Sequence, residues 1–213
     1  MSRFAIIGAL AVLLCLAALH TLSPEFDPSW RMVSEYANGG YRWLLSLMFV
    51  CWAVSTWALA AALKPLLHSR AGTIGWVVLL IAGVGEMLAA IFDINHSLHG
   101  LAGALGILGL PLAAMLLGIS LSHLAAWKPI RPLVLLLSNL TWLSVVLMAF
   151  AMFQLFSQLS AIGYDMTAPT TPTSTLPDEV HAFVGWANRL LIVAYSAWAM
   201  LMAWGARKSV PAA

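Results

Sequence analysis

Six long runs of apolar residues, separated by more polar stretches, dominate the pattern along the chain. Each run has about 20 residues, the length that an α-helix needs to cross the hydrocarbon core of a bilayer. The pattern therefore predicts an all-α membrane protein, with residues 1–213 forming a single bundle of six transmembrane helices. The predicted spans are 4–22, 42–63, 73–94, 99–122, 132–158 and 183–206.

Composition supports this class. Hydrophobic residues make up 62% of the chain and charged residues only 8%, with a mean hydropathy of +0.92, which is far more apolar than a soluble domain of this size needs. Arg3 and the apolar run after it resemble a signal peptide, but no small-x-small cleavage site follows, so we interpret this run as a mature helix. We find no basic patch for nucleic acid and predict no nucleic-acid partner.

Lysine and arginine separate between the two ends of the predicted spans. Seven of them flank the ends that include both termini, and three flank the opposite ends. The positive-inside rule then predicts cytoplasmic N- and C-termini in the inner (plasma) membrane. The seven are Arg3, Lys64, Arg70, Lys128, Arg131, Arg207 and Lys208, and the three are Arg31, Arg42 and Arg189.

Two connections, 23–41 and 159–182, are longer than the rest, and both are expected on the outer side. Residues 31–40 are polar and aromatic, which predicts a short amphipathic helix lying along the outer interface. The Thr/Pro-rich part of 159–182 favours neither helix nor strand, and we expect an irregular, mobile lid over the outer mouth.

Glycines recur at three-residue spacing in span 99–122 and give that helix a smooth stripe. Small residues allow close approach of neighbouring helices, so the stripe predicts that this helix is the centre of the bundle. Homo-oligomerisation through the stripe and packing within one chain both explain these glycines.

The stretch from Glu86 to His99 is the strongest candidate site. It places Glu86, Asp93, His96 and His99 at the end of one apolar span and the start of the next. Glu86 and Asp93 are seven residues apart, roughly 10 Å along one helix face. Ionisable groups at membrane depth are costly and are usually functional. The outer half of the bundle also collects His20, Glu35, His181, Asn188 and Arg189.

One hypothesis is a binding protein with an outward-facing polar pocket, open to the outside or periplasm. It would bind or sense a membrane lipid or a small amphiphile, and Arg189 would hold an anionic head group. The ligand-binding residues are then Arg189, Asn188, Glu86 and Asp93.

A second hypothesis is a metal-dependent intramembrane hydrolase of lipid amides or esters. Imidazoles and carboxylates suit a divalent metal such as zinc, and the predicted ligands are Asp93, His96, His99 and His181. Glu35 or Glu86 would act as the catalytic base on metal-activated water. This hypothesis predicts stoichiometric metal in the purified protein. Paired histidines on separate helices are also the arrangement that holds a haem iron, although here all of them lie near helix ends.

Two further interpretations remain. A small-solute transporter coupled to protons through Glu86 would show uptake that depends on that residue. In a purely structural interpretation, Asp93 caps the following helix and Arg189 neutralises Glu86 or Asp93.

Several short motifs resemble one known family. They are Ser34-Glu35-Tyr36, Phe92-Asp93, the run His99-Gly-Leu-Ala-Gly-Ala-Leu, and Gly185-Trp-Ala-Asn-Arg189. Over nearly the whole chain the sequence resembles the prokaryotic membrane family called domain of unknown function 998, which is grouped loosely with the Frag, DRAM and Sfk membrane proteins.

The resemblance implies a six-helix fold with outward polar motif residues, and it supplies no activity and no substrate. In the family a proline commonly separates the Phe and the Asp, and a glutamine commonly precedes the Arg. Here Phe92 and Asp93 are adjacent, and Asn188 takes the place of the glutamine.

Overall fold

The computed structural model describes residues 1–165, 171 and 173–209. All regular elements in this part of the chain are helical, and six of the helices are long and apolar enough to cross a membrane. These six are α1 (Ser2–Leu22), α2 (Arg42–Leu63), α3 (Arg70–Ile91), α4 (His99–Ser122), α5 (Arg131–Ala161) and α6 (Val184–Ser209). The predicted spans 42–63 and 99–122 are reproduced, and the other four differ by at most three residues at either end.

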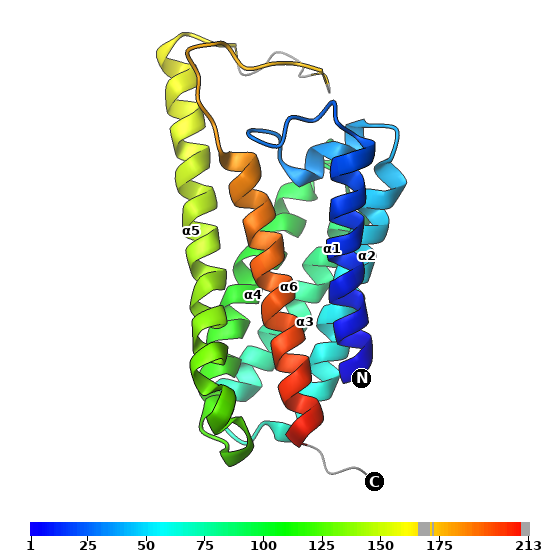
Figure 1. Ribbon diagram of the computed structural model, residues 1–213, viewed down its shortest axis with the longest axis vertical. Helices are drawn as coiled ribbons and strands as arrows, with labels where there is room; N and C mark the ends of the chain where they lie inside the picture. Colours follow the sequence, from blue (N-terminus) through cyan, green and yellow to red (C-terminus); the bar gives the residue numbers. More distant parts are fainter. Residues whose placement is uncertain (166–170, 172, 210–213) are drawn as a thin grey trace.

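Three short 3₁₀ helices lie in the connections: η1 (Val33–Asn38), η2 (Lys64–Leu66) and η3 (Ala125–Ile130). The start of α1 and the end of α6 lie at the same end of the bundle (Figure 1). The two long connections, 23–41 and 162–183, lie at the opposite end, which we call the long-connection end. Which end faces the cytoplasm stays a prediction.

The six helices form a closed ring in chain order, because α1 packs on α2, α2 on α3, and so on around to α6 on α1. Helix α6 also contacts α2 and α4 across the ring. It is the most buried span, with 67% of its most apolar window buried against 39% for α4. The prediction that helix 99–122 is the centre of the bundle is therefore wrong. Of its glycines, Gly106 and Gly109 face α3, Gly118 faces α5, and Gly100 and Gly103 face no other helix.

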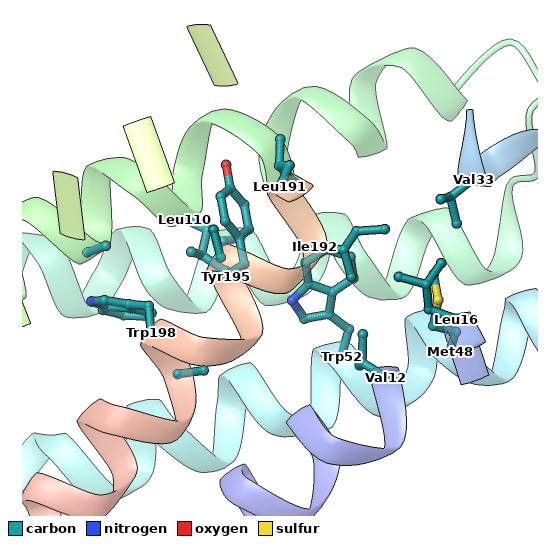
Figure 2. Close-up of a cluster of buried hydrophobic side chains, with 14 of the residues drawn as sticks. Val12, Leu16, Val33, Met48, Trp52, Leu110, Leu191, Ile192, Tyr195 and Trp198 are labelled. Atoms are coloured by element: carbon teal, nitrogen blue, oxygen red, sulfur yellow. The ribbon is translucent and has the colours of Figure 1, made fainter. Parts of the chain in front are cut away.

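Side chains that face away from the bundle are apolar, as a lipid environment requires. On α5 alone, Leu136, Leu143, Phe150 and Phe153 are each more than half exposed. The bundle interior is a continuous apolar cluster. Figure 2 shows its middle part, where Trp52 of α2 lies beside Ile192 of α6 and near Val12 of α1.

Glycine sets the close contact between α3 and α4. A Cβ added to Gly85 would lie 2.7 Å from the carbonyl oxygen of Ala102 and 2.7 Å from the backbone nitrogen of Gly106. Two backbones can approach this closely only where the side chain is a hydrogen atom. The pair α3–α4 therefore depends on Gly85, whereas a Cβ on Gly103 would meet nothing closer than Ile107 Cδ1 at 4.0 Å.

We predict that Gly85→Ala lowers the free energy of unfolding by about 1–3 kcal/mol, the usual cost of overpacking. Gly103→Ala is the matched control on the facing helix, and we expect it to be neutral or slightly stabilising because alanine favours helix. Thermal unfolding of the detergent-purified variants measures both. Equal midpoints for the two variants would contradict the close α3–α4 contact.

Candidate functional site

The guanidinium of Arg189 is buried at the long-connection end and holds the 23–41 segment. Its Nη1 donates to the carbonyl oxygens of Arg31 at 2.8 Å and Gly185 at 2.9 Å, and its Nη2 donates to the hydroxyl oxygen of Tyr36 at 2.9 Å. The residue is only 6% exposed. A buried cation with these partners fixes the backbone of the segment, because removing any partner leaves a donor unsatisfied at high cost.

Two further contacts dock the same segment on the start of α6. Gly185 donates its backbone N–H to the carbonyl oxygen of Ser29 at 3.1 Å, and Val33 donates its N–H to Oδ1 of Asn188 at 2.9 Å. A Cβ on Gly185 would lie 2.4 Å from the carbonyl oxygen of Pro28, so only glycine admits this approach. The segment includes η1, but Tyr36 in it is 1% exposed. The predicted short helix is thus present and packs into the bundle end, and its position relative to the membrane interface stays a prediction.

Glu35 pairs with Arg31 inside this segment. Nη1 of Arg31 lies 2.5 Å from Oε2 of Glu35, and Oε1 accepts the backbone N–H of Met32 at 2.8 Å. Nη2 of Arg31 donates to the carbonyl oxygen of Thr171, and the guanidinium lies 4.1 Å from the ring centre of Trp30. Both oxygens of Glu35 therefore have partners within the described residues.

A cavity of about 100 Å³ lies beneath the segment. Its walls come from α2, α3, α4 and α6, and residues 32–34 contribute from above. Aromatic and aliphatic side chains dominate the lining, which includes Phe49, Trp52, Ala89, Gly103, Leu191, Ile192 and Tyr195. The rings of Phe49 and Trp52 are stacked with centres 6.3 Å apart, and Tyr195 meets Trp52 edge-on at 6.1 Å. We call this space the Glu86 cavity.

Glu86 is the one carboxylic side chain in the wall of this cavity. It is 5% exposed, and neither carboxyl oxygen has a hydrogen-bond partner in the described part of the chain. The hydroxyl of Thr56 approaches it from α2 without meeting hydrogen-bond geometry. Among the described residues, the lining contains no lysine or arginine. An unpaired buried carboxyl group is costly, so a ligand that donates a hydrogen bond to Glu86 would stabilise the site.

The turn between α3 and α4 joins the cavity to the 23–41 segment. Nδ1 of His99 lies 2.8 Å from the carbonyl oxygen of Phe92. A carbonyl only accepts, so Nδ1 carries the proton and Nε2 is an acceptor in the neutral ring. Asn95 donates from Nδ2 to Oδ1 of Asn38 at 2.9 Å. His99 also lines the cavity, so this turn forms part of its rim.

A second cavity of about 190 Å³ lies on the other side of the 23–41 segment, against α5. Met32 lines both cavities, and Glu35 lines only this one. The two predicted catalytic bases, Glu35 and Glu86, therefore line different cavities.

The predicted metal ligands do not gather in one place. Asp93 and His96 are exposed in the α3–α4 turn, where Oδ1 of Asp93 accepts the N–H of Asn95 and Nδ1 of His96 accepts the N–H of Leu98. His181 is exposed and exchanges two hydrogen bonds with Gln158 through its backbone. Across residues 1–165, 171 and 173–209, no group of three or more His, Cys, Asp or Glu could hold a metal ion. The metal site and the hydrolase hypothesis stay predictions that this arrangement does not support.

The structural interpretation is wrong in two details. Asp93 closes its own turn, while α4 begins after Leu98 without a side-chain cap. Arg189 bonds carbonyl and hydroxyl oxygens of the segment and the start of α6, and it contacts neither Glu86 nor Asp93 through a hydrogen bond. It also lines neither cavity, so its predicted grip on an anionic head group stays a prediction without support here.

Three of the predicted site residues do meet: Glu86, His99 and Asn188 all line the Glu86 cavity. Sequence reasoning missed the aromatic wall of Trp52 and Tyr195. A signal was present, because Tyr195 follows Asn188 by seven residues and so shares its helix face. Figure 2 shows the Tyr195 hydroxyl turned towards α4, where it donates to the carbonyl oxygen of Ile107 at 2.6 Å.

Fold and site together define a multi-pass helical membrane protein that encloses a carboxyl-bearing cavity at one end of its bundle. Residues 6–205 match the family described as "Protein of unknown function (DUF998)", and the chain belongs to this family. The looser grouping with the Frag, DRAM and Sfk proteins is not confirmed by this match.

No curated protein and no solved structure matches the chain.

We predict that Arg189→Met releases the 23–41 segment, because three donor contacts from one buried cation are lost together. The expected cost is about 2–5 kcal/mol of unfolding free energy, the range for breaking a buried, hydrogen-bonded charge. Hydrogen exchange of the backbone amides of residues 28–38 should become at least tenfold faster.

Arg207→Met is the matched control, since Arg207 lies exposed on the same helix. We expect it to leave exchange in residues 28–38 unchanged. Equal exchange in the two variants would show that Arg189 does not hold the segment.

Proposed function

We propose that this protein binds a small membrane amphiphile in the Glu86 cavity, on the outer side of the cell's inner (plasma) membrane. The observation that carries the proposal is a largely apolar, aromatic-lined space that holds one unpartnered carboxyl group. Ligand pockets combine these features: an apolar wall for the body of the ligand and a few polar groups that orient its head.

The size of the cavity limits what enters it. A water molecule needs on the order of 10–15 Å³ of such space, so about 100 Å³ accepts a head group with a few methylenes and not a whole lipid. The rest of an alkyl chain must leave the bundle. The open face of α4 at Gly103 supports such an exit, because an added Cβ there would meet nothing closer than 4.0 Å.

The 23–41 segment supports binding in a second way. Met32, Val33 and Ser34 cover the cavity, and the contacts to Arg189 and Asn188 hold the backbone around them. A cavity that is formed before the ligand arrives avoids the ordering cost of building a site on binding.

A cavity-filling variant tests this function. Gly103→Leu places an isobutyl group in the open space of the cavity wall, whereas Gly100→Leu adds the same group to the exposed start of α4, outside the lining. We expect native mass spectrometry to show a bound amphiphile on the wild type and on Gly100→Leu, and at least tenfold less on Gly103→Leu. Equal occupancy of both variants, or none on the wild type, would contradict the proposal.

A further inference from the structure

Among the described residues, the Glu86 cavity has hydrogen-bond acceptors without a partner and no positively charged side chain in its lining. The Tyr195 hydroxyl donates to the carbonyl oxygen of Ile107, and the Asn188 amide is engaged through Oδ1 with Val33 and through Nδ2 with the sulfur of Met148. The Tyr195 hydroxyl and the Asn188 amide are therefore already engaged. Both carboxyl oxygens of Glu86 remain without a partner among the described residues.

His99 adds to the excess of acceptors. Its Nδ1–H is committed to the carbonyl oxygen of Phe92, which leaves Nε2 as an acceptor in the neutral ring. The two guanidinium groups nearby do not correct the balance. The Nη atoms of Arg31 and Arg189 are bonded to the segment or to residues against it, and their Nε atoms have no partner among the described residues, but neither residue lines either cavity.

Space is available for the Glu86 side chain to turn towards the cavity. Gly106 of α4 lies opposite, and a Cβ added there would lie 3.6 Å from Cγ of Glu86, so no α4 side chain covers the carboxyl group at this point. The rings of Phe49, Trp52 and Tyr195 line the same space. Aromatic faces attract cations and repel anions.

We propose that the cavity selects amphiphiles with a protonated primary amine head, whose N–H groups bond to the Glu86 carboxylate while its first methylenes lie against Trp52 and Ile192. This inference rests on the proposed amphiphile binding and names the class of head group. The charge of this head group is opposite to the one expected from the sequence, where Arg189 suggested an anionic head. An ammonium group supplies N–H donors for the unpaired Glu86 oxygens, together with a positive charge that no described residue of the lining carries.

Four short amphiphiles test the head group: octylamine, octanol, octanoate and octyltrimethylammonium. Binding to the detergent-purified protein is measured by the rise in the thermal unfolding midpoint against ligand concentration, which reports affinity for the folded state. We expect octylamine to bind the wild type about tenfold or more tightly than the other three. Octyltrimethylammonium is the sharpest comparison because it has the charge but no N–H donor.

Glu86→Gln should weaken octylamine binding about tenfold or more and leave octanol unchanged. Glu179→Gln makes the same charge change at an exposed position at the long-connection end and should have no effect. Gly103→Leu should abolish binding of every ligand that enters the cavity, which locates the effect there.

The failures of the two proposals are distinguishable. If octanol or octanoate binds as well as octylamine, or if Glu86→Gln has no effect while Gly103→Leu still blocks binding, the amine assignment is overturned and amphiphile binding stands. Equal affinity for octyltrimethylammonium also overturns it, because that head cannot donate a hydrogen bond. If none of the four ligands stabilises the wild type, both proposals fail.

Discussion

The buried guanidinium of Arg189 is the interaction on which the functional end of this protein depends. A cation inside an apolar bundle must be surrounded by acceptors, and here the carbonyl oxygen of Arg31 and the hydroxyl of Tyr36 come from the 23–41 segment. Because the Arg189 guanidinium needs these acceptors, it holds the 23–41 segment against the bundle. Gly185 makes the arrangement sterically feasible, because any larger residue would collide with the backbone of Pro28.

The cavity follows from this docking and from the contact between α3 and α4. Residues 32–34 cover the space, and Gly85 lets α3 approach α4 so closely that Glu86 lies across from Gly106. The glycines serve two purposes on one helix pair: they bring two backbones together at Gly85, and they leave open space in front of Gly103. The carboxyl group is thus placed in a wall where neither of its oxygens has a hydrogen-bond partner among the described residues.

Hydrophobic runs predicted the six helices to within three residues, because length and apolarity are set locally by the bilayer. They could not predict which helix is the most buried. The glycines of α4 favoured that helix, but a larger share of α6 is buried. For the site, Glu86 was identified from its cost in a membrane, and His99 and Asn188 as members of the polar set in the outer half of the bundle. The role of Arg189 was not, because its partners are backbone carbonyls 158 and 4 residues away, and the sequence carries no mark of a carbonyl acceptor.

Thiol labelling inside the cavity measures most directly whether Arg189 keeps the 23–41 segment over Glu86. A cysteine at Ala89, in the cavity wall, is introduced into a chain with Cys15→Ala and Cys51→Ala and reacted with a small neutral thiol reagent. The account predicts slow labelling that becomes at least tenfold faster with Arg189→Met, while a cysteine at exposed Gly100 labels at one rate in both backgrounds. Unchanged labelling at position 89 would contradict it.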